Sequence, residues 1–159
     1  MAEPASAAAE IAEGATVGAV LTVLRMSRVM ERIDAGVSPQ QYRMLKLIGA
    51  GGERSARLAE RLAVTKPTLT STADSLVTAG LVCREAEPGD RRVVRLHLTE
   101  AGQAAVARAD EAYAAWLDDL LEYTGRKDKI LASLQLLDQS MTERRRARRR
   151  AEDTSAGQQ

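Results

Sequence analysis

Hydrophobic residues recur every three or four positions over most of the chain, which is the spacing of an amphipathic helix. Between residues 15 and 34 this spacing is carried by Val17, Val20, Leu21, Leu24 and Met30. The same pattern predicts further helices over residues of about 39–49, 55–63, 65–79, 99–124 and 127–150. We therefore expect a mainly helical protein.

Local sequence signals place the ends of these helices. Ser38 and Gln41 have the spacing of a capping box, with Pro39 at the first helical position between them. Thr65 has the position of an N-cap, and Gly80 suits the left-handed backbone conformation that ends the following helix. Three short helices thus follow one another closely between residues 39 and 79.

One segment departs from the helical spacing. Residues 81–87 and 91–98 alternate apolar and polar side chains, and a Pro-Gly-Asp turn joins them, which predicts a β-hairpin. Alternate side chains of a strand share a face. The face expected to meet the helices holds Val94, Leu96 and Leu98, and the face expected to meet solvent holds Val93, Arg95 and His97. Three short helices followed by a hairpin form a winged helix-turn-helix.

Composition narrows the class of protein further. The chain has 159 residues, 45% of them hydrophobic, which fits one compact domain. One cysteine and one histidine leave no internal disulfide and no metal cluster, and we find no phosphate-binding glycine loop or nucleophile with a partner base. We therefore expect neither an enzyme nor a bound cofactor or metal. No apolar run is long enough to span a bilayer, so we expect a cytoplasmic protein.

In a helix-turn-helix, the second helix enters the major groove of DNA and its first turns meet base edges. Here this helix covers residues 65–79, with Leu69, Ala73, Leu76 and Val77 at the spacing of an inward face. Its outer side then holds Lys66, Pro67, Thr68, Thr70, Ser71 and Asp74. Small hydroxyl side chains can bond phosphates or base edges. The alternative is that they only solvate a surface helix.

The tip of the hairpin carries Asp90, Arg91 and Arg92. A hairpin beside a groove-bound helix reaches the neighbouring minor groove, whose negative potential attracts a guanidinium group. We expect Arg92 to enter this groove, Asp90 to hold Arg92 in place, and Arg91 and Arg95 to meet phosphates. The alternative is that these are ordinary surface charges, whose ion pairs contribute little.

Residues of about 37 to 102 resemble the MarR family of bacterial transcriptional regulators. The resemblance is carried by the stretch from "LAERLAVTKPTLTSTADSLVTAGLV" through the Asp-x-Arg wing tip at Asp90 and Arg92 to Leu98, Thr99 and Gly102. It implies a homodimer, built by the first and last two helices, that binds double-stranded DNA at a pseudo-palindromic operator. Ser71 and Ser75 depart from the family, in which these positions are often basic.

With this resemblance, the fold class is mainly α with a small β-hairpin wing, a winged helix-turn-helix plus a helical dimerisation region. The expected organisation is a flexible segment over 1–14, a dimerisation region over 15–36 and 100–150, a DNA-binding domain over 37–99, and a disordered tail over 151–159. The expected DNA contacts are Arg54, Arg57, Thr65, Lys66, Pro67, Thr68, Thr70, Ser71, Arg84, Asp90, Arg91, Arg92 and Arg95. The expected function is a transcriptional regulator, a repressor relieved by a small molecule.

Many relatives in this family release DNA when a small phenolic or lipophilic molecule fills a crevice beside the winged unit. The candidate lining residues are Met26, Met30, Tyr42, Tyr113 and Trp116. A stripe of methionine and aromatic residues at helical spacing is more often packed core than a ligand site. Both interpretations stay open at this stage.

Three further features allow alternatives. Cys83 could make the chain a redox-responsive regulator, although a small, partly buried strand residue is the simpler interpretation. The chain could also be a winged-helix module that binds proteins. Six arginines between residues 144 and 150 could hold phosphates, or could pair across a dimer with the acidic start of the chain at Glu3, Glu10 and Glu13.

Overall fold

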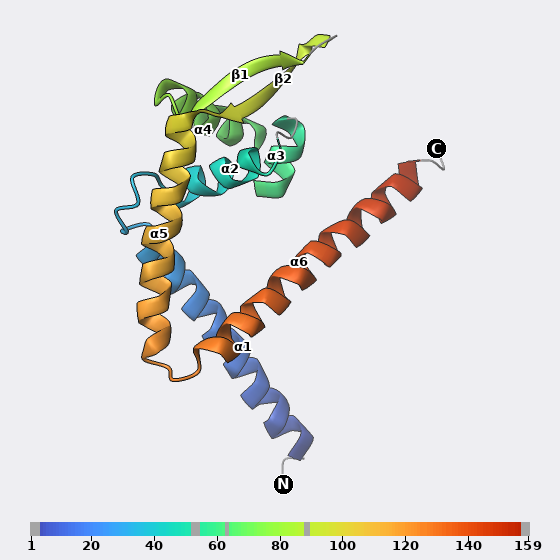
Figure 1. Ribbon diagram of the computed structural model, residues 1–159. Helices are drawn as coiled ribbons and strands as arrows, with labels where there is room; N and C mark the ends of the chain where they lie inside the picture. Colours follow the sequence, from blue (N-terminus) through green and yellow to red (C-terminus); the bar gives the residue numbers. More distant parts are fainter. Residues whose placement is uncertain (1–3, 52–54, 63, 88–89, 157–159) are drawn as a thin grey trace. The chain divides into compact units, whose positions relative to one another are not determined.

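The computed structural model describes residues 4–51, 55–62, 64–87 and 90–156 (Figure 1). The described elements are α1 (Pro4–Met30), α2 (Pro39–Gly49), α3 (Ser55–Leu62), α4 (Lys66–Thr78), β1 (Val82–Glu87), β2 (Asp90–Leu98), α5 (Glu100–Glu122) and α6 (Lys127–Ala156). Their order confirms the predicted fold of helices with one hairpin. The chain forms two compact units, one ending at Tyr113 within α5 and the other beginning at Ala114.

The two outer helices are longer than the pattern predicted. α1 begins at Pro4, so most of the segment 1–14 that we expected to be flexible is helical, and it ends at Met30, before the predicted end at residue 34. Proline is tolerated in a first helical turn, and the alanines that follow have the highest helix propensity. α6 likewise continues to Ala156, beyond the predicted helix end at residue 150.

The core of the winged unit is aliphatic and comes from every one of its elements. Met44 and Leu45 of α2, Leu58 of α3 and Leu76 of α4 are fully buried. Leu69, Val82 and Leu96 join the same cluster from α4, β1 and β2. This packing holds α4 and the base of the hairpin in one compact core, as expected for close-packed interiors.

The predicted caps are present. The Ser38 hydroxyl accepts from the Gln41 amide at 3.2 Å, and the Gln41 side chain accepts from the Ser38 amide at 2.9 Å. Thr65 caps α4, and Gly80 has a φ of 69° just beyond its end. These bonds satisfy amide groups that a helix end would otherwise leave without partners.

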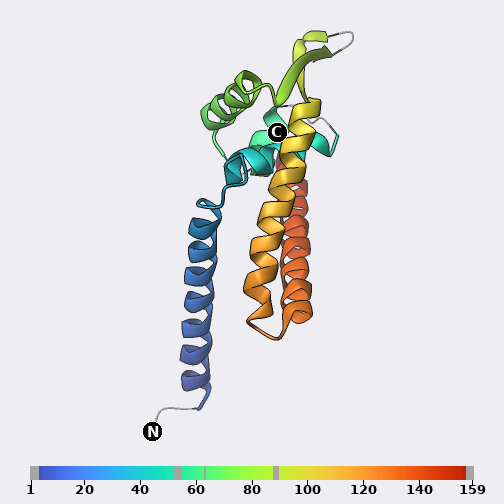
Figure 2. The ribbon, with the colours of Figure 1, turned by 60° about the vertical axis from the view of Figure 1, so that its left-hand side comes forward.

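The hairpin is antiparallel, with Val82 opposite Leu98 and Arg84 opposite Leu96. Figures 1 and 2 show it extending beyond α2, α3 and α4. Leu96 is buried, which confirms the predicted inward face at the base of the hairpin. Val94 belongs to the same face but is 39% exposed, because it lies nearer the tip of the hairpin, where less of the helical core covers it.

A tight junction joins the hairpin to α5. The Thr99 hydroxyl donates to the Gly80 carbonyl at 2.7 Å and accepts from the Gly102 amide at 3.0 Å. The Thr99 amide donates to the Leu81 carbonyl at 3.1 Å. Gly102 is buried, and a Cβ atom there would lie 2.0 Å from the Leu81 oxygen. Only glycine therefore fits at this position.

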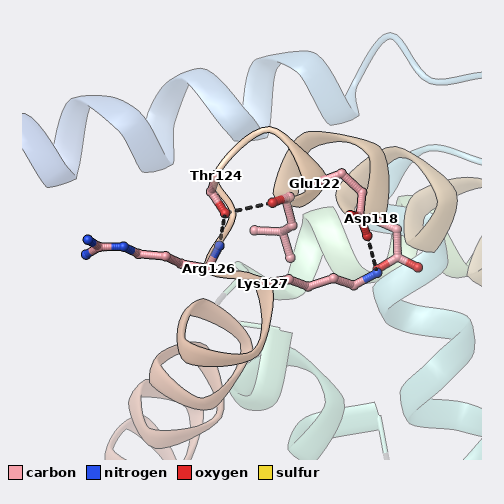
Figure 3. A network of polar contacts seen from close by, with 6 residues as sticks. Asp118, Glu122, Thr124, Arg126 and Lys127 are labelled. Atoms are coloured by element: carbon pink, nitrogen blue, oxygen red, sulfur yellow. Dashed lines mark hydrogen bonds and ion pairs between the residues drawn. The ribbon is translucent and has the colours of Figure 1, made fainter.

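The second unit contains the end of α5 and all of α6, and Figure 3 shows the polar contacts at the turn between these helices. The Lys127 ammonium contacts Asp118 at 3.1 Å and Glu122 at 3.2 Å. The Thr124 hydroxyl donates to the Leu121 carbonyl at 2.7 Å, and Gly125 has a φ of 60°. The predicted break at Gly125 is confirmed, and the ion pairs tie the two helices at their shared turn.

Candidate nucleic-acid interface

The outer side of α4 is polar, as its sequence predicted. Leu69, Ala73 and Leu76 are buried. The predicted outer set, Lys66, Pro67, Thr68, Thr70, Ser71 and Asp74, is exposed at every position. The helix therefore presents one face of small polar side chains, with its apolar face anchored in the core.

Two threonine hydroxyls of α4 donate hydrogen bonds to backbone carbonyls one turn earlier in the same helix. The Thr70 hydroxyl donates to the Lys66 carbonyl at 3.0 Å, and the Thr72 hydroxyl donates to the Thr68 carbonyl at 2.9 Å. Their oxygen lone pairs and methyl groups remain for other contacts. Such a surface suits base edges that donate hydrogen bonds and the methyl group of thymine.

Two glutamines of α2 hold the opposite flank of α4. Gln40 Nε2 donates to the Thr72 hydroxyl at 3.1 Å, and Gln41 Nε2 donates to the Ser75 hydroxyl at 3.3 Å. Gln41 therefore closes the capping box of α2 and contacts α4 with the same side chain. Ser75, which the sequence resemblance places at an often basic position, here bonds to α2. No local sequence signal links residues this far apart.

Arg84, one of the expected DNA contacts, pairs within the protein in this structure. Its guanidinium donates to the carboxylate of Asp74 on α4. Both side chains are about half exposed, at 46% and 54%. The alternation of β1 explains this orientation, because Arg84 lies on the same face as Val82 and opposite Leu96.

The outward face of the hairpin carries further polar side chains. His97 Nε2 lies 3.4 Å from Glu85 Oε2, and Arg95 is half-buried. Cys83 is exposed, and its thiol donates to the His97 carbonyl at 3.7 Å. The expectation of a partly buried Cys83 was wrong, because its position in β1 places it on the outward face with Glu85.

Several predicted contacts fall outside what the structure describes. Arg54 lies outside the described residues. Of Arg57, Asp90, Arg91 and Arg92 only the backbone is described, in α3 and at the start of β2. Their assignment to DNA contact stays a prediction from the sequence and from the position of the hairpin.

The residues predicted to line an effector crevice are partly packed together. The rings of Tyr42 and Tyr113 lie 5.0 Å apart between centroids, and Met30 packs against the same cluster. The Tyr113 hydroxyl donates to the Val37 carbonyl at 3.3 Å. Met26 is half-buried on α1, and Trp116 is half-buried in the second unit. In this structure Met30, Tyr42 and Tyr113 serve as core.

A charged network lies beside this cluster. The Tyr42 hydroxyl donates to Asp110, and the Lys46 ammonium lies 3.0 Å from both carboxylate oxygens. Burial, together with the hydrogen bond and charge of Asp110, raises the pKa of Tyr42 to about 12. The hydrogen bond from Tyr42, aided by Lys46 and opposed by burial, lowers the pKa of Asp110. The network joins α2 of the winged unit to α5.

The Tyr42→Phe variant tests this network by its pH dependence. A carboxyl group with a lowered folded pKa contributes stability above its unfolded pKa, and this is lost as the pH falls through the folded value. We expect the free energy of unfolding to drop by about 1 kcal/mol at pH 7, and the deficit to shrink below about pH 4. Urea unfolding of the wild type and the variant, at pH 7 and at a pH below about 4, measures this deficit.

Tyr113→Phe is the matched control, because its hydroxyl donates to a backbone carbonyl that does not titrate. Its deficit should be the same at both pH values. A Tyr42→Phe deficit that is equally independent of pH would contradict the role assigned to Asp110.

Two classes of site are not found in the part of the chain that the structure describes. There, His, Cys, Asp and Glu form no group of three or more that could hold a metal ion. Among the same residues, no helix has the length and apolarity needed to cross a lipid bilayer.

Comparison with known proteins agrees with this geometry. The sequence model of the MarR family matches residues 35–93. The HTH-type transcriptional regulator FarR of Neisseria gonorrhoeae is 31% identical over 99 residues, which are 62% of this chain and 68% of FarR.

Solved structures are similar over most of the chain. The transcriptional repressor CouR, bound to a 23-mer DNA duplex, is 28% identical with a TM-score of 0.65, over 80% of this chain and 94% of CouR. NadR in complex with 4-hydroxyphenylacetate is 26% identical with a TM-score of 0.58, over 78% of this chain and 88% of NadR. The chain therefore belongs to the MarR family of winged helix-turn-helix transcriptional regulators.

Proposed function

We propose that this protein is a dimeric, sequence-specific DNA-binding repressor that a small aromatic or lipophilic molecule releases from its operator. The observation that carries the proposal is the exposed polar face of α4 beside a hairpin that projects past the helices. This pairing of elements suits two adjacent grooves of one duplex. The similarity to CouR, which was solved on a DNA duplex, supports the same mode of binding.

Exposed apolar side chains support a dimer with a second copy of the chain. On α1, the side chains of Val17, Val20, Leu21, Val23 and Leu24 are each more than half exposed. On α6, those of Leu136, Leu137 and Met141 are too. Apolar surfaces of this extent on a single chain mark interaction sites. Two copies would place two recognition helices on a symmetric site.

An aromatic cluster with a neighbouring cation supports the proposed effector site. NadR was solved with 4-hydroxyphenylacetate, a phenol with a carboxylate. In this chain, Tyr42 and Tyr113 supply aromatic surface, and Lys46 lies beside them as a cation with its ammonium 5.9 Å from the Tyr42 ring centre. A ligand of that class would have to open the packed cluster.

Selection from a random duplex library, combined with sedimentation of the free protein, tests the proposed function. We expect a dimer at micromolar concentration, and enriched duplexes with two inverted half-sites whose centres lie about 10 base pairs apart, one helical turn. Affinity should fall steeply as salt rises. A folded dimer that enriches no sequence would contradict DNA binding and favour the protein-interaction alternative. A monomer would contradict the assembly.

A further inference from the structure

The ion pair between Asp74 and Arg84 lies where two DNA-facing elements meet. Asp74 follows Lys66 and Thr70 at four-residue spacing, so it belongs to the exposed stripe of the recognition helix. Arg84 lies on the helix-facing side of the hairpin, opposite Leu96. The pair therefore joins the element proposed for the major groove to the element proposed for the minor groove.

Packing holds only the base of the hairpin, so the rest of the hairpin can tilt relative to α4. Val82 and Leu96 are buried, which fixes the base. Beside them, a cleft of about 270 Å³ opens at the edge of the contact between α4 and the hairpin, and it is lined by Leu69, Thr70, Ala73, Arg84, Val94 and Leu96. An open cleft resists tilting less than a close-packed interface does. Arg84 lines this cleft, and its ion pair with Asp74 joins β1 to α4 beside it.

A small tilt at the base would be amplified at the tip. Arg92 lies four positions before Leu96, a distance of about 13 Å along an extended strand. A tilt of about 10° would then displace the tip by about 2 Å, which is enough to misplace a guanidinium group in a narrow groove.

We propose that Asp74 is a positioning residue for DNA binding, which acts through Arg84 to hold the hairpin at the angle that fits adjacent grooves. The inference rests on the proposed DNA-binding function. The positioning role and simple charge repulsion predict opposite effects of removing Asp74 on DNA affinity. A carboxylate on a DNA-facing surface repels phosphates, so its removal should strengthen binding if charge alone mattered. If Asp74 positions the hairpin, its removal weakens binding.

The variants Asp74→Asn, Arg84→Gln and the double variant form the test, with a duplex selected by the wild-type protein as the probe. Each single variant should lose affinity by about five- to tenfold, and the double variant should lose little more than either single one, because both remove the same contact. The loss should come with weaker hydroxyl-radical protection of the minor groove, while major-groove protection persists. The urea unfolding midpoint should change little, because the pair is half exposed.

Glu111→Gln is the matched control, since it removes one negative charge from an exposed position on α5. It should leave affinity unchanged or slightly raised. If Asp74→Asn binds as tightly as the wild type or more tightly, the positioning role is wrong. In that case a loss confined to Arg84→Gln, with a smaller salt slope, would assign Arg84 to phosphate contact.

A measurement without DNA separates this inference from the proposed function. Nitroxide labels at Glu85→Cys and Arg108→Cys, in a Cys83→Ser background, report the distance between the hairpin and α5 by electron-electron resonance. With labelled chains diluted into an excess of unlabelled chains, so that each dimer carries one labelled chain, we expect a narrow distance distribution that broadens on adding Asp74→Asn. An unchanged distribution overturns the inference even if the wild type binds DNA. Selection of no duplex by the wild type overturns the proposed function, and the distance distribution still decides the role of Asp74.

Discussion

Gly102→Ala should destabilise the protein by about 3 kcal/mol or more, which corresponds to a fall in melting temperature of roughly 10 °C. The Cβ atom would lie 2.0 Å from the Leu81 carbonyl oxygen and 3.0 Å from its carbon. These are backbone atoms, so no side-chain rotation relieves the contact. Leu81 also accepts from the Thr99 amide, and moving it would break the bond that joins the hairpin to α5.

Gly14→Ala is the control for this effect. It makes the same chemical change within α1, where a Cβ atom would meet no atom of the described chain within 4 Å. Alanine favours a helix interior over glycine, so this variant should be unchanged or more stable by up to about 1 kcal/mol. Thermal unfolding of both variants at one protein concentration gives the comparison. Similar stabilities would contradict the close approach at the junction.

Arg92→Ala should weaken binding to the selected operator by about 100-fold, because one inserted guanidinium contributes up to about 3 kcal/mol. β2 begins at Asp90, so the strand carries the backbone of Arg92 to the projecting end of the hairpin. The minor groove concentrates negative potential, which favours a guanidinium more strongly than an open phosphate does. Fluorescence anisotropy over a range of salt concentrations measures the loss.

Lys66→Ala should cost less affinity than Arg92→Ala. Lys66 is exposed at the first position of α4, where an ammonium group meets phosphates as a point charge. Its loss should weaken binding to all sequences alike and reduce the salt slope by about one. Equal losses for the two variants would contradict this division between the helix and the wing.

Local chemistry explains which parts of the fold were predictable. Ser38 and Gln41 satisfy each other within one turn, so their spacing alone predicts the capping box that the structure shows. Gly80 and Gly125 end helices through their own backbone conformation, with φ of 69° and 60°. Such features depend on neighbours in sequence, and the structure confirmed them.

The contacts that position the candidate site join residues distant in sequence. The Tyr42 bond to Asp110 spans 68 positions, and the Gln41 bond to Ser75 spans 34. No periodic pattern encodes such partners, because they arise only when α2 packs on α4 and α5. The side of the hairpin on which Arg84 lies is easier to predict, because strand alternation alone places Arg84 on the helix-facing side with Val82.

The start of α1 shows the opposite error. The segment 1–14 was expected to be flexible, but the structure begins α1 at Pro4 and continues it through Gly14. Proline without an amide hydrogen is harmless in a first turn, and one glycine costs only about 1 kcal/mol among alanines. The sum of propensities over the segment outweighs the two unfavourable residues.

Chemical footprinting of the wild-type protein on its selected operator tests the central claim most directly. In each half-site, dimethyl sulfate should report protection of guanine N7 in one major groove, and hydroxyl radicals should report protection of the adjacent minor groove. Arg92→Ala should lose the second signal and keep the first. Protection of the major groove alone by the wild-type protein, with Arg92→Ala giving the same pattern, would contradict the account.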